Sequence, residues 1–324
     1  MAAILIEDPT LLAADRALEE AENKQKTRTY VGMSNAGGCM RQNYYRFYIA
    51  GWGFHAHKTL KMFADGHRSE ALTIDRLRLV EGLTIIDRDP DTGRQLECVD
   101  FDGHYKGHLD FEVLGLLQAP KTWHVGEVKC VGENEFRKFK KLKENNNEKL
   151  VLKQWRETYY AQAQQYMMYR GRKRHYMVVT SAGGREWDSC RTDFNKEDAQ
   201  LYAGRARSII EHPDKMPDRI SENGTFYICK YMCEFTGICH EGEAPARNCR
   251  TCVWSEPIAN AGFRCIKHEK RLTPRDQREG CADQRYRPAL LNAEVQSVDD
   301  QKNEITYRVG DGYWIDKGAE DGSV

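Results

Sequence analysis

The sequence predicts an α/β fold with a cysteine-rich, metal-binding C-terminal part. Two observations support this prediction. Helical patterns and strand-like runs follow one another in the order helix, antiparallel strands, helix, strand, which is typical of an α/β or α+β core. Seven of the eleven cysteines are crowded between Cys229 and Cys281, too densely for ordinary core cysteines.

The expected elements follow from local patterns. Residues 1–30 have the composition of a polar amphipathic helix and a loop. Further helices are expected at 34–51, 60–80, 147–170 and 196–211. Strands are expected within 83–103, 104–115, 122–132 and 174–182, separated by turn residues such as those of "DPDTG". No internal repeat is present.

These elements divide the chain into four parts. They are an N-terminal helical segment at 1–30, a core at 31–240, a metal-binding module at 241–288 and a polar tail at 289–324 with one candidate hairpin, "EITYRVGDGYWIDKG".

Charge and hydropathy limit the location and partners of the protein. The formal net charge is zero, so any basic surface for a polyanion must be local. No apolar run reaches transmembrane length, and the first twenty residues lack the features of a secretion signal. We expect a cytoplasmic protein without a membrane partner, and in such a protein many cysteines indicate metal ligands rather than disulfides.

The stretch "HVGEVKC" places an acid and a base on one face of an expected strand. Glu127 and Lys129 are two residues apart, and Asp110 lies in the preceding apolar run "GHLDFEVLG". Antiparallel pairing of the two runs would bring Asp110 beside Glu127 and Lys129. Two carboxylates suit Mg²⁺ or Mn²⁺, held by Asp110, Glu127 and the carbonyl of Val128. A salt bridge on a half-exposed strand is the plainer alternative.

Two further motifs flank this pair. "FADGHRSE" contains Gly66 and, four residues later, Glu70, with His67 as the alternative ligand. "YYAQAQQYMMY" places Gln162 and Tyr166 one helical turn apart, although Gln165 and Tyr169 have the same spacing.

The order of these motifs resembles that of the RecB-like branch of the PD-(D/E)XK nuclease superfamily. The resemblance implies a restriction-endonuclease-like core, with a central mixed sheet flanked by helices, and a Mg²⁺- or Mn²⁺-dependent deoxyribonuclease activity. It also implies two residue sets, a catalytic one of Asp110, Glu127, Lys129, Gln162 and Tyr166, and a metal-binding one of Glu70, Asp110, Glu127 and Val128.

The same branch includes the AddB nucleases and other members with a 4Fe–4S cluster. "SNAGGCMRQNYYRF" resembles their N-terminal ligand motif, and "YICKYMCEFTGICHEG" supplies three later cysteines. The resemblance therefore implies a cluster held by Cys39, Cys229, Cys233 and Cys239. Over residues 34–290 the arrangement also resembles a group of uncharacterised phage nucleases.

The remaining cysteines predict a second metal. Cys249 and Cys252 form a C-x2-C pair, and Cys265 and Cys281 follow, which is enough for a closed, structural zinc site. His240, His268 and Cys281 compete for the last position, and Cys281 is preferred.

Basic runs beside the catalytic motifs are the expected DNA contacts, although solvated helix faces are the plainer alternative. Lys138, Lys141, Arg172 and Arg174 are expected to contact phosphates with little sequence specificity. The expected function is a DNA nuclease, an exonuclease by preference, in phage recombination, repair or host-DNA degradation. A single-strand binding protein, recombinase or helicase is the expected protein partner. The rival is a non-catalytic DNA-binding or assembly module that keeps the same fold.

Overall fold

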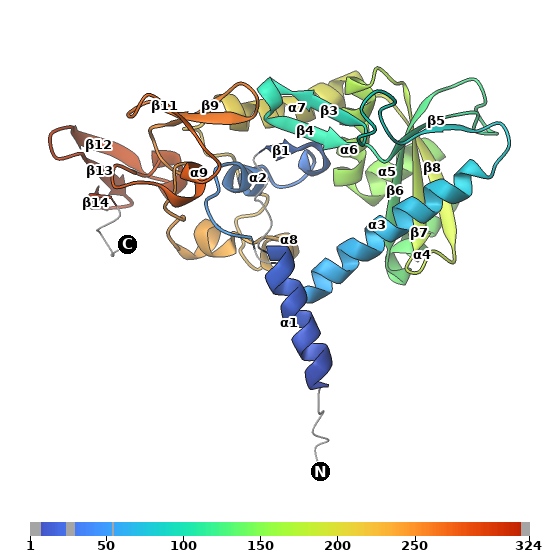
Figure 1. Ribbon diagram of the computed structural model, residues 1–324, viewed down its shortest axis with the longest axis horizontal. Helices are drawn as coiled ribbons and strands as arrows, with labels where there is room; N and C mark the ends of the chain where they lie inside the picture. The colour runs from blue at the N-terminus through green and yellow to red at the C-terminus, as the bar shows by residue number, and fades with distance from the viewer. Residues whose placement is uncertain (1–7, 24–29, 54, 319–324) are drawn as a thin grey trace, which may run out of the picture.

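The computed structural model describes residues 8–23, 30–53 and 55–318. The expected segment 1–30 and the tail 289–324 therefore lie partly outside the described residues. The molecule is elongated, with a five-stranded sheet at one end, a small C-terminal sheet at the other and α1 projecting between them (Figure 1). No helix within the described ranges is both long and apolar enough to cross a membrane.

The helices and strands alternate along the chain. The helices are α1 (Pro9–Asn23), α2 (Met40–Phe47), α3 (His57–Arg78), α4 (Glu133–Asn145), α5 (Glu148–Trp155), α6 (Glu157–Tyr169), α7 (Lys196–Glu211), α8 (Tyr227–Met232) and α9 (Asp276–Glu279). The strands of the N-terminal two thirds are β1 (Val31–Gly32), β2 (Thr84–Ile86), β3 (Glu97–Asp100), β4 (Tyr105–His108), β5 (Phe111–Leu114), β6 (His124–Val131), β7 (Arg174–Ser181) and β8 (Trp187–Asp193). The C-terminal strands are β9 (Ser255–Ile258), β10 (Gly262–Cys265), β11 (Lys270–Leu272), β12 (Glu294–Asp299), β13 (Glu304–Val309) and β14 (Gly312–Asp316).

The largest sheet has the order β2-β5-β6-β7-β8. It is mixed because β6 and β7 are parallel and its other neighbours are antiparallel. The parallel pair needs a crossover connection, which α4, α5 and α6 provide. The expectation of a mixed α/β fold is confirmed.

Both faces of this sheet are buried against helices. On one face Val128 and Val178 pack with Ile74 and Leu77 of α3. On the other face the core that contains Val125, Met177 and Val179 includes apolar residues of α4, α5 and α6. Side chains alternate between the faces of a strand, so Glu127 and Lys129 share the face of Val125, toward α6.

The prediction of a single helix at 147–170 is wrong, because the chain is interrupted at Arg156 and forms two helices, α5 and α6. Arg156 has extended backbone angles (φ −153°, ψ 110°). The break ends α5 at Trp155, which is buried with its ring centroid 4.9 Å from that of Phe139 in α4. Tertiary packing therefore overrides a helix-favouring sequence at this point.

The C-terminal third shares a core with the rest of the protein. Arg250, fully buried, lies over the rings of both Phe47 and Phe263 and donates to the carbonyl of Phe47. The expected hairpin at 304–318 is present as β13 and β14, and β12 extends it to three strands.

Candidate functional site

The two candidate catalytic carboxylates meet where β5 begins beside β6. Phe111 pairs with Gly126 in antiparallel register, so Asp110, one residue earlier, lies beside Glu127. The backbone N–H of Val128 donates to Asp110 Oδ2 at 2.7 Å. Asp110 and Glu127 are 8% and 2% exposed, so two acidic groups are buried together.

Glu127 is the centre of the hydrogen-bond network. Its Oε1 accepts from the amine of Lys129 and from Gln162 Nε2, the latter at 2.8 Å. Its Oε2 is buried and has no protein partner. An unpaired carboxylate oxygen in a buried site is costly unless a cation or a donor is supplied from outside the chain.

Tyr166 anchors this network to the neighbouring strand. Its hydroxyl accepts from Gln162 Nε2 at 3.2 Å and donates to the carbonyl of His108 at 2.8 Å. A Cβ at Gly107 would lie 2.4 Å from the Tyr166 ring, so β4 needs glycine here.

The alternative pair, Gln165 and Tyr169, contacts other groups. Gln165 accepts from Tyr105 and donates to the Ala199 carbonyl, and Tyr169 donates to Asp100. Gln162 and Tyr166 are therefore the members of this helix that reach Glu127.

Electrostatics in the site are dominated by crowded negative charge. Burial, and then the charge of Glu127, raise the pKa of Asp110 well above its usual value. The same two causes raise the pKa of Glu70 on α3, but the carboxylate oxygens of Glu70, Asp110 and Glu127 do not all lie within 4.8 Å of one another. Burial alone would lower the pKa of Lys129, but the charges of Glu127 and Asp110 raise it. Lys129 therefore stays protonated.

The four cysteines expected to hold a cluster line one small pocket. Cys39 precedes α2, Cys229 lies in α8, and Cys233 and Cys239 follow it. Burial, and then the neighbouring thiols Cys39 and Cys239, raise the pKa of Cys229.

Contacts between α2 and the segment formed by α8 and the residues up to Cys239, here called the α8 segment, hold this pocket together. Arg46 pairs with Glu234 at 2.9 Å, and Gln42 donates to the Met232 carbonyl at 3.1 Å.

The other four cysteines line a second cavity, of about 220 Å³. Burial, followed by the thiols of Cys252, Cys281 and Cys265, raises the pKa of Cys249 to about 12. His268 and Asp283 line the same cavity, whereas His240 lines the first pocket. Asp283 was not expected from the sequence, because it has no metal-ligand spacing. The spacing Cys265-x2-His268 is a signal that favours His268.

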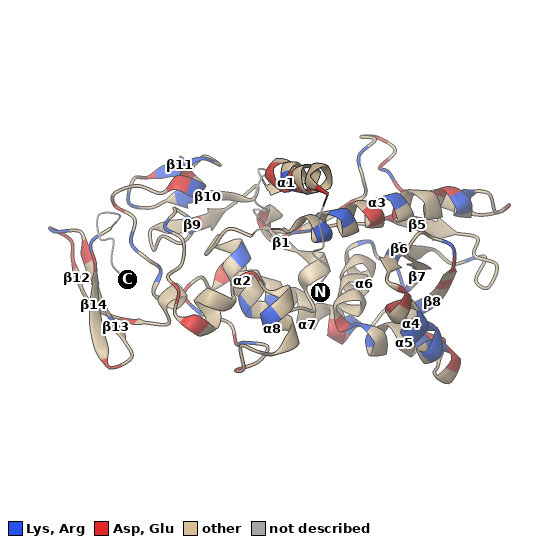
Figure 2. Cartoon of the chain, turned by 90° about the horizontal axis from the view of Figure 1, so that it is seen from below, with Lys and Arg blue, Asp and Glu red and all other residues tan. Residues whose placement is uncertain are grey.

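The candidate DNA-binding residues fall into two groups. Lys138 and Lys141 are exposed on α4, which begins just after the strand of Glu127 and carries several cations (Figure 2). Arg172 pairs with the buried Glu112 at 2.8 Å, and Arg174 pairs with Asp193 at 3.3 Å. The charges of these two arginines are thus partly balanced within the protein.

No protein-family model and no curated protein sequence matches the chain. Among solved structures, SSO0001 is 14% identical, with 72% of this chain and 96% of that chain covered. An alkaline exonuclease from Laribacter hongkongensis is 13% identical over 61% of this chain and 91% of that one. A phage-related exonuclease from Haemophilus somnus 129PT is 11% identical over 56% and 92%. Each has a TM-score of 0.39.

Proposed function

We propose that the protein is a metal-dependent DNA nuclease, an exonuclease that hydrolyses phosphodiester bonds in phage DNA recombination, repair or host-DNA degradation. The observation that carries this proposal is the buried pair Asp110 and Glu127 beside one protonated amine, Lys129. A non-catalytic module has no evident need for this costly arrangement.

The donor set fits a hard divalent cation. Asp110, Glu127 and Glu70 offer carboxylate oxygens, Val128 lies between Glu127 and Lys129 with a backbone carbonyl, and Glu127 Oε2 has no protein partner. The raised pKa of Asp110 reports negative charge that such a cation would offset. When bound, Mg²⁺ or Mn²⁺ would supply the positive charge that activates water and balances the charge of a phosphodiester.

The chain's own residues position the reacting groups. Lys129 carries a positive charge that can offset charge developing on a phosphate. Gln162 fixes the rotamer of Glu127, and Tyr166 fixes Gln162 through the His108 carbonyl. Gln162 and Tyr166 are thus positioning residues for Glu127.

DNA would be bound through its backbone. Lys138 and Lys141 are the main candidates for phosphate contacts, because no salt bridge occupies either of them within the described residues. Arg172 and Arg174 would contribute after exchanging their carboxylate partners for phosphate. No feature of the site reads base edges, so binding should have little sequence specificity.

The two cysteine sites are proposed to hold metals that stabilise the fold. Cys39, Cys229, Cys233 and Cys239 share one pocket, as the ligands of a 4Fe–4S cluster would. Cys249, Cys252, Cys265 and Cys281 share the second, as the ligands of a structural Zn²⁺ would. A single-strand binding protein, recombinase or helicase would be the partner of such an exonuclease.

Incubation of the protein with linear and closed-circular duplex DNA, with Mg²⁺, Mn²⁺ or a chelator, tests the function. We expect linear DNA to be degraded only when a divalent metal is present, and circular DNA to persist. Asp110→Asn and Glu127→Gln should lose cleavage but keep the fold and DNA binding. Absence of cleavage under all conditions, or full activity of Glu127→Gln, would refute the proposal.

A further inference from the structure

The cavity at the C-terminal cysteines is surrounded by more metal-binding side chains than one zinc needs. A structural zinc takes four ligands in a tetrahedron. Seven side chains of ligand type line this cavity, namely Cys249, Cys252, Cys265, His268, Asp276, Cys281 and Asp283, and the carboxylate of Asp276 accepts from Thr273 and Lys270. Three thiols are buried, those of Cys249, Cys252 and Cys265. The fourth ligand could therefore come from more than one of the less buried side chains at the rim of the cavity, among them His268 and Cys281.

The local chain geometry brings His268 to the rim. Cys265 ends β10 and pairs with Lys270 of β11, so His268 lies in the turn between the two strands. The spacing Cys265-x2-His268 repeats that of Cys249-x2-Cys252. Each pair offers two ligands from one short segment, so the two pairs would supply four ligands without Cys281.

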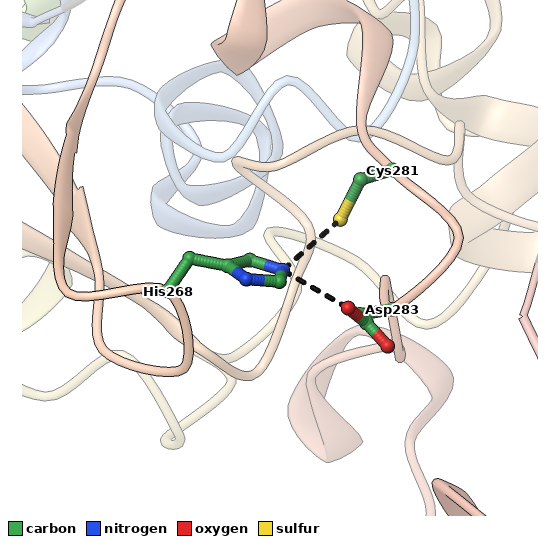
Figure 3. A group of neighbouring side chains, drawn as sticks. All are labelled: His268, Cys281 and Asp283. Carbon is green, nitrogen blue, oxygen red and sulfur yellow. Dashed lines mark hydrogen bonds and ion pairs between the residues drawn. The ribbon is translucent and has the colours of Figure 1, made fainter.

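Cys281 reaches the same place from the opposite side. Its sulfur lies 3.9 Å from His268 Nε2 (Figure 3). Typical zinc–sulfur and zinc–nitrogen bonds, of about 2.3 and 2.0–2.1 Å, place the two donor atoms of one tetrahedral zinc roughly 3.6 Å apart. The two donors are thus already at the separation of neighbouring ligands.

Asp283 contacts the same imidazole nitrogen that faces Cys281. Its Oδ2 lies 3.0 Å from His268 Nε2, and its Oδ1 accepts from Asn303 Nδ2 at 2.8 Å. Asn303 belongs to the turn between β12 and β13, so the C-terminal sheet fixes the carboxylate. A metal bound to Nε2 would therefore take the place of this contact with Asp283.

We propose that zinc in this cavity is bound by Cys249, Cys252 and Cys265 and by a fourth ligand that either Cys281 or His268 supplies. The inference rests on the zinc site proposed above. The site should therefore keep its zinc when either Cys281 or His268 is replaced, and lose it only when both are replaced.

Zinc content per chain tests the exchange in the full-length protein. We expect one zinc in the wild type, in Cys281→Ser and in His268→Ala, and none in the double variant. His212→Ala, at an exposed histidine after α7, is the matched control. A wild-type protein without zinc would overturn the zinc site itself. Loss of zinc from either single variant, or its retention by the double variant, would overturn the exchange alone.

A second measurement separates ligation from a merely structural role. With Co²⁺ in place of zinc, His268→Ala should show stronger thiolate-to-cobalt absorption than Cys281→Ser, since it binds through four thiolates rather than three. Identical spectra of the two variants would contradict the proposal.

Discussion

At the scale of single residues, Lys129 is the only cation that contacts Glu127 within the described residues. Lys129→Ala should lower the cleavage rate by at least about 10²- to 10³-fold, because positive charge next to the reacting phosphate is lost. DNA affinity should change little. A cleavage assay at saturating DNA measures the effect, with Lys302→Ala in the C-terminal sheet as the control. Near-normal cleavage by Lys129→Ala would remove the lysine from the proposed mechanism.

His175 should make stability depend on pH. It is 1% exposed, and burial, followed by the charges of Lys129 and His124, lowers its pKa to about 3. The unfolded chain, with a pKa of about 6.5, binds the proton more readily. The contribution of neutral, buried His175 to the free energy of unfolding is therefore complete above about pH 6.5. It is lost as the pH falls toward 3, because the unfolded chain takes up the proton first.

Between pH 7 and pH 5 this loss amounts to about 2 kcal/mol. Urea unfolding at the two pH values should show a smaller drop for His175→Gln than for the wild type. The exposed His212→Gln should behave like the wild type. Equal drops for all three proteins would show that His175 is not held neutral.

At the scale of elements, α2 and the α8 segment are held together on either side of the first cysteine pocket. Anaerobically purified protein should be brown, with broad visible absorption, because cysteine-bound iron–sulfur clusters absorb there. Cys39→Ala should lose the colour, since it removes the proposed ligand that precedes α2. Cys130→Ala, which lies outside this pocket, should keep it. Colourless wild-type protein that contains only zinc would indicate two zinc sites instead.

Element positions were predictable where a local pattern fixes them. Alternation in β5 and β6 sets the register, and the register alone places Asp110 beside Glu127. The break at Arg156 was not predictable, because the sequence on both sides favours a helix and the cause is the packing of Trp155 on Phe139. Asp283 accepts from Asn303, twenty residues later in the turn between β12 and β13, and no local spacing encodes such a contact.

At the scale of the whole molecule, a formal net charge of zero means that DNA binding depends on where the cations lie. Lys138 and Lys141 are exposed on α4, at the end of the molecule that carries the carboxylates (Figure 2). Each phosphate contact releases counterions, so affinity falls with salt at a slope set by the number of contacts.

Replacing both lysines by alanine should therefore weaken DNA binding equally for unrelated sequences and reduce the salt slope by about 2. The measurement uses the cleavage-deficient Glu127→Gln protein with labelled duplexes at several salt concentrations. Lys302→Ala, at the opposite end of the molecule, should leave affinity and slope unchanged, because no long-range attraction from a neutral protein survives screening at moderate salt. An unchanged slope in the double variant would place the DNA on another face, and a loss confined to one sequence would mean that α4 reads bases.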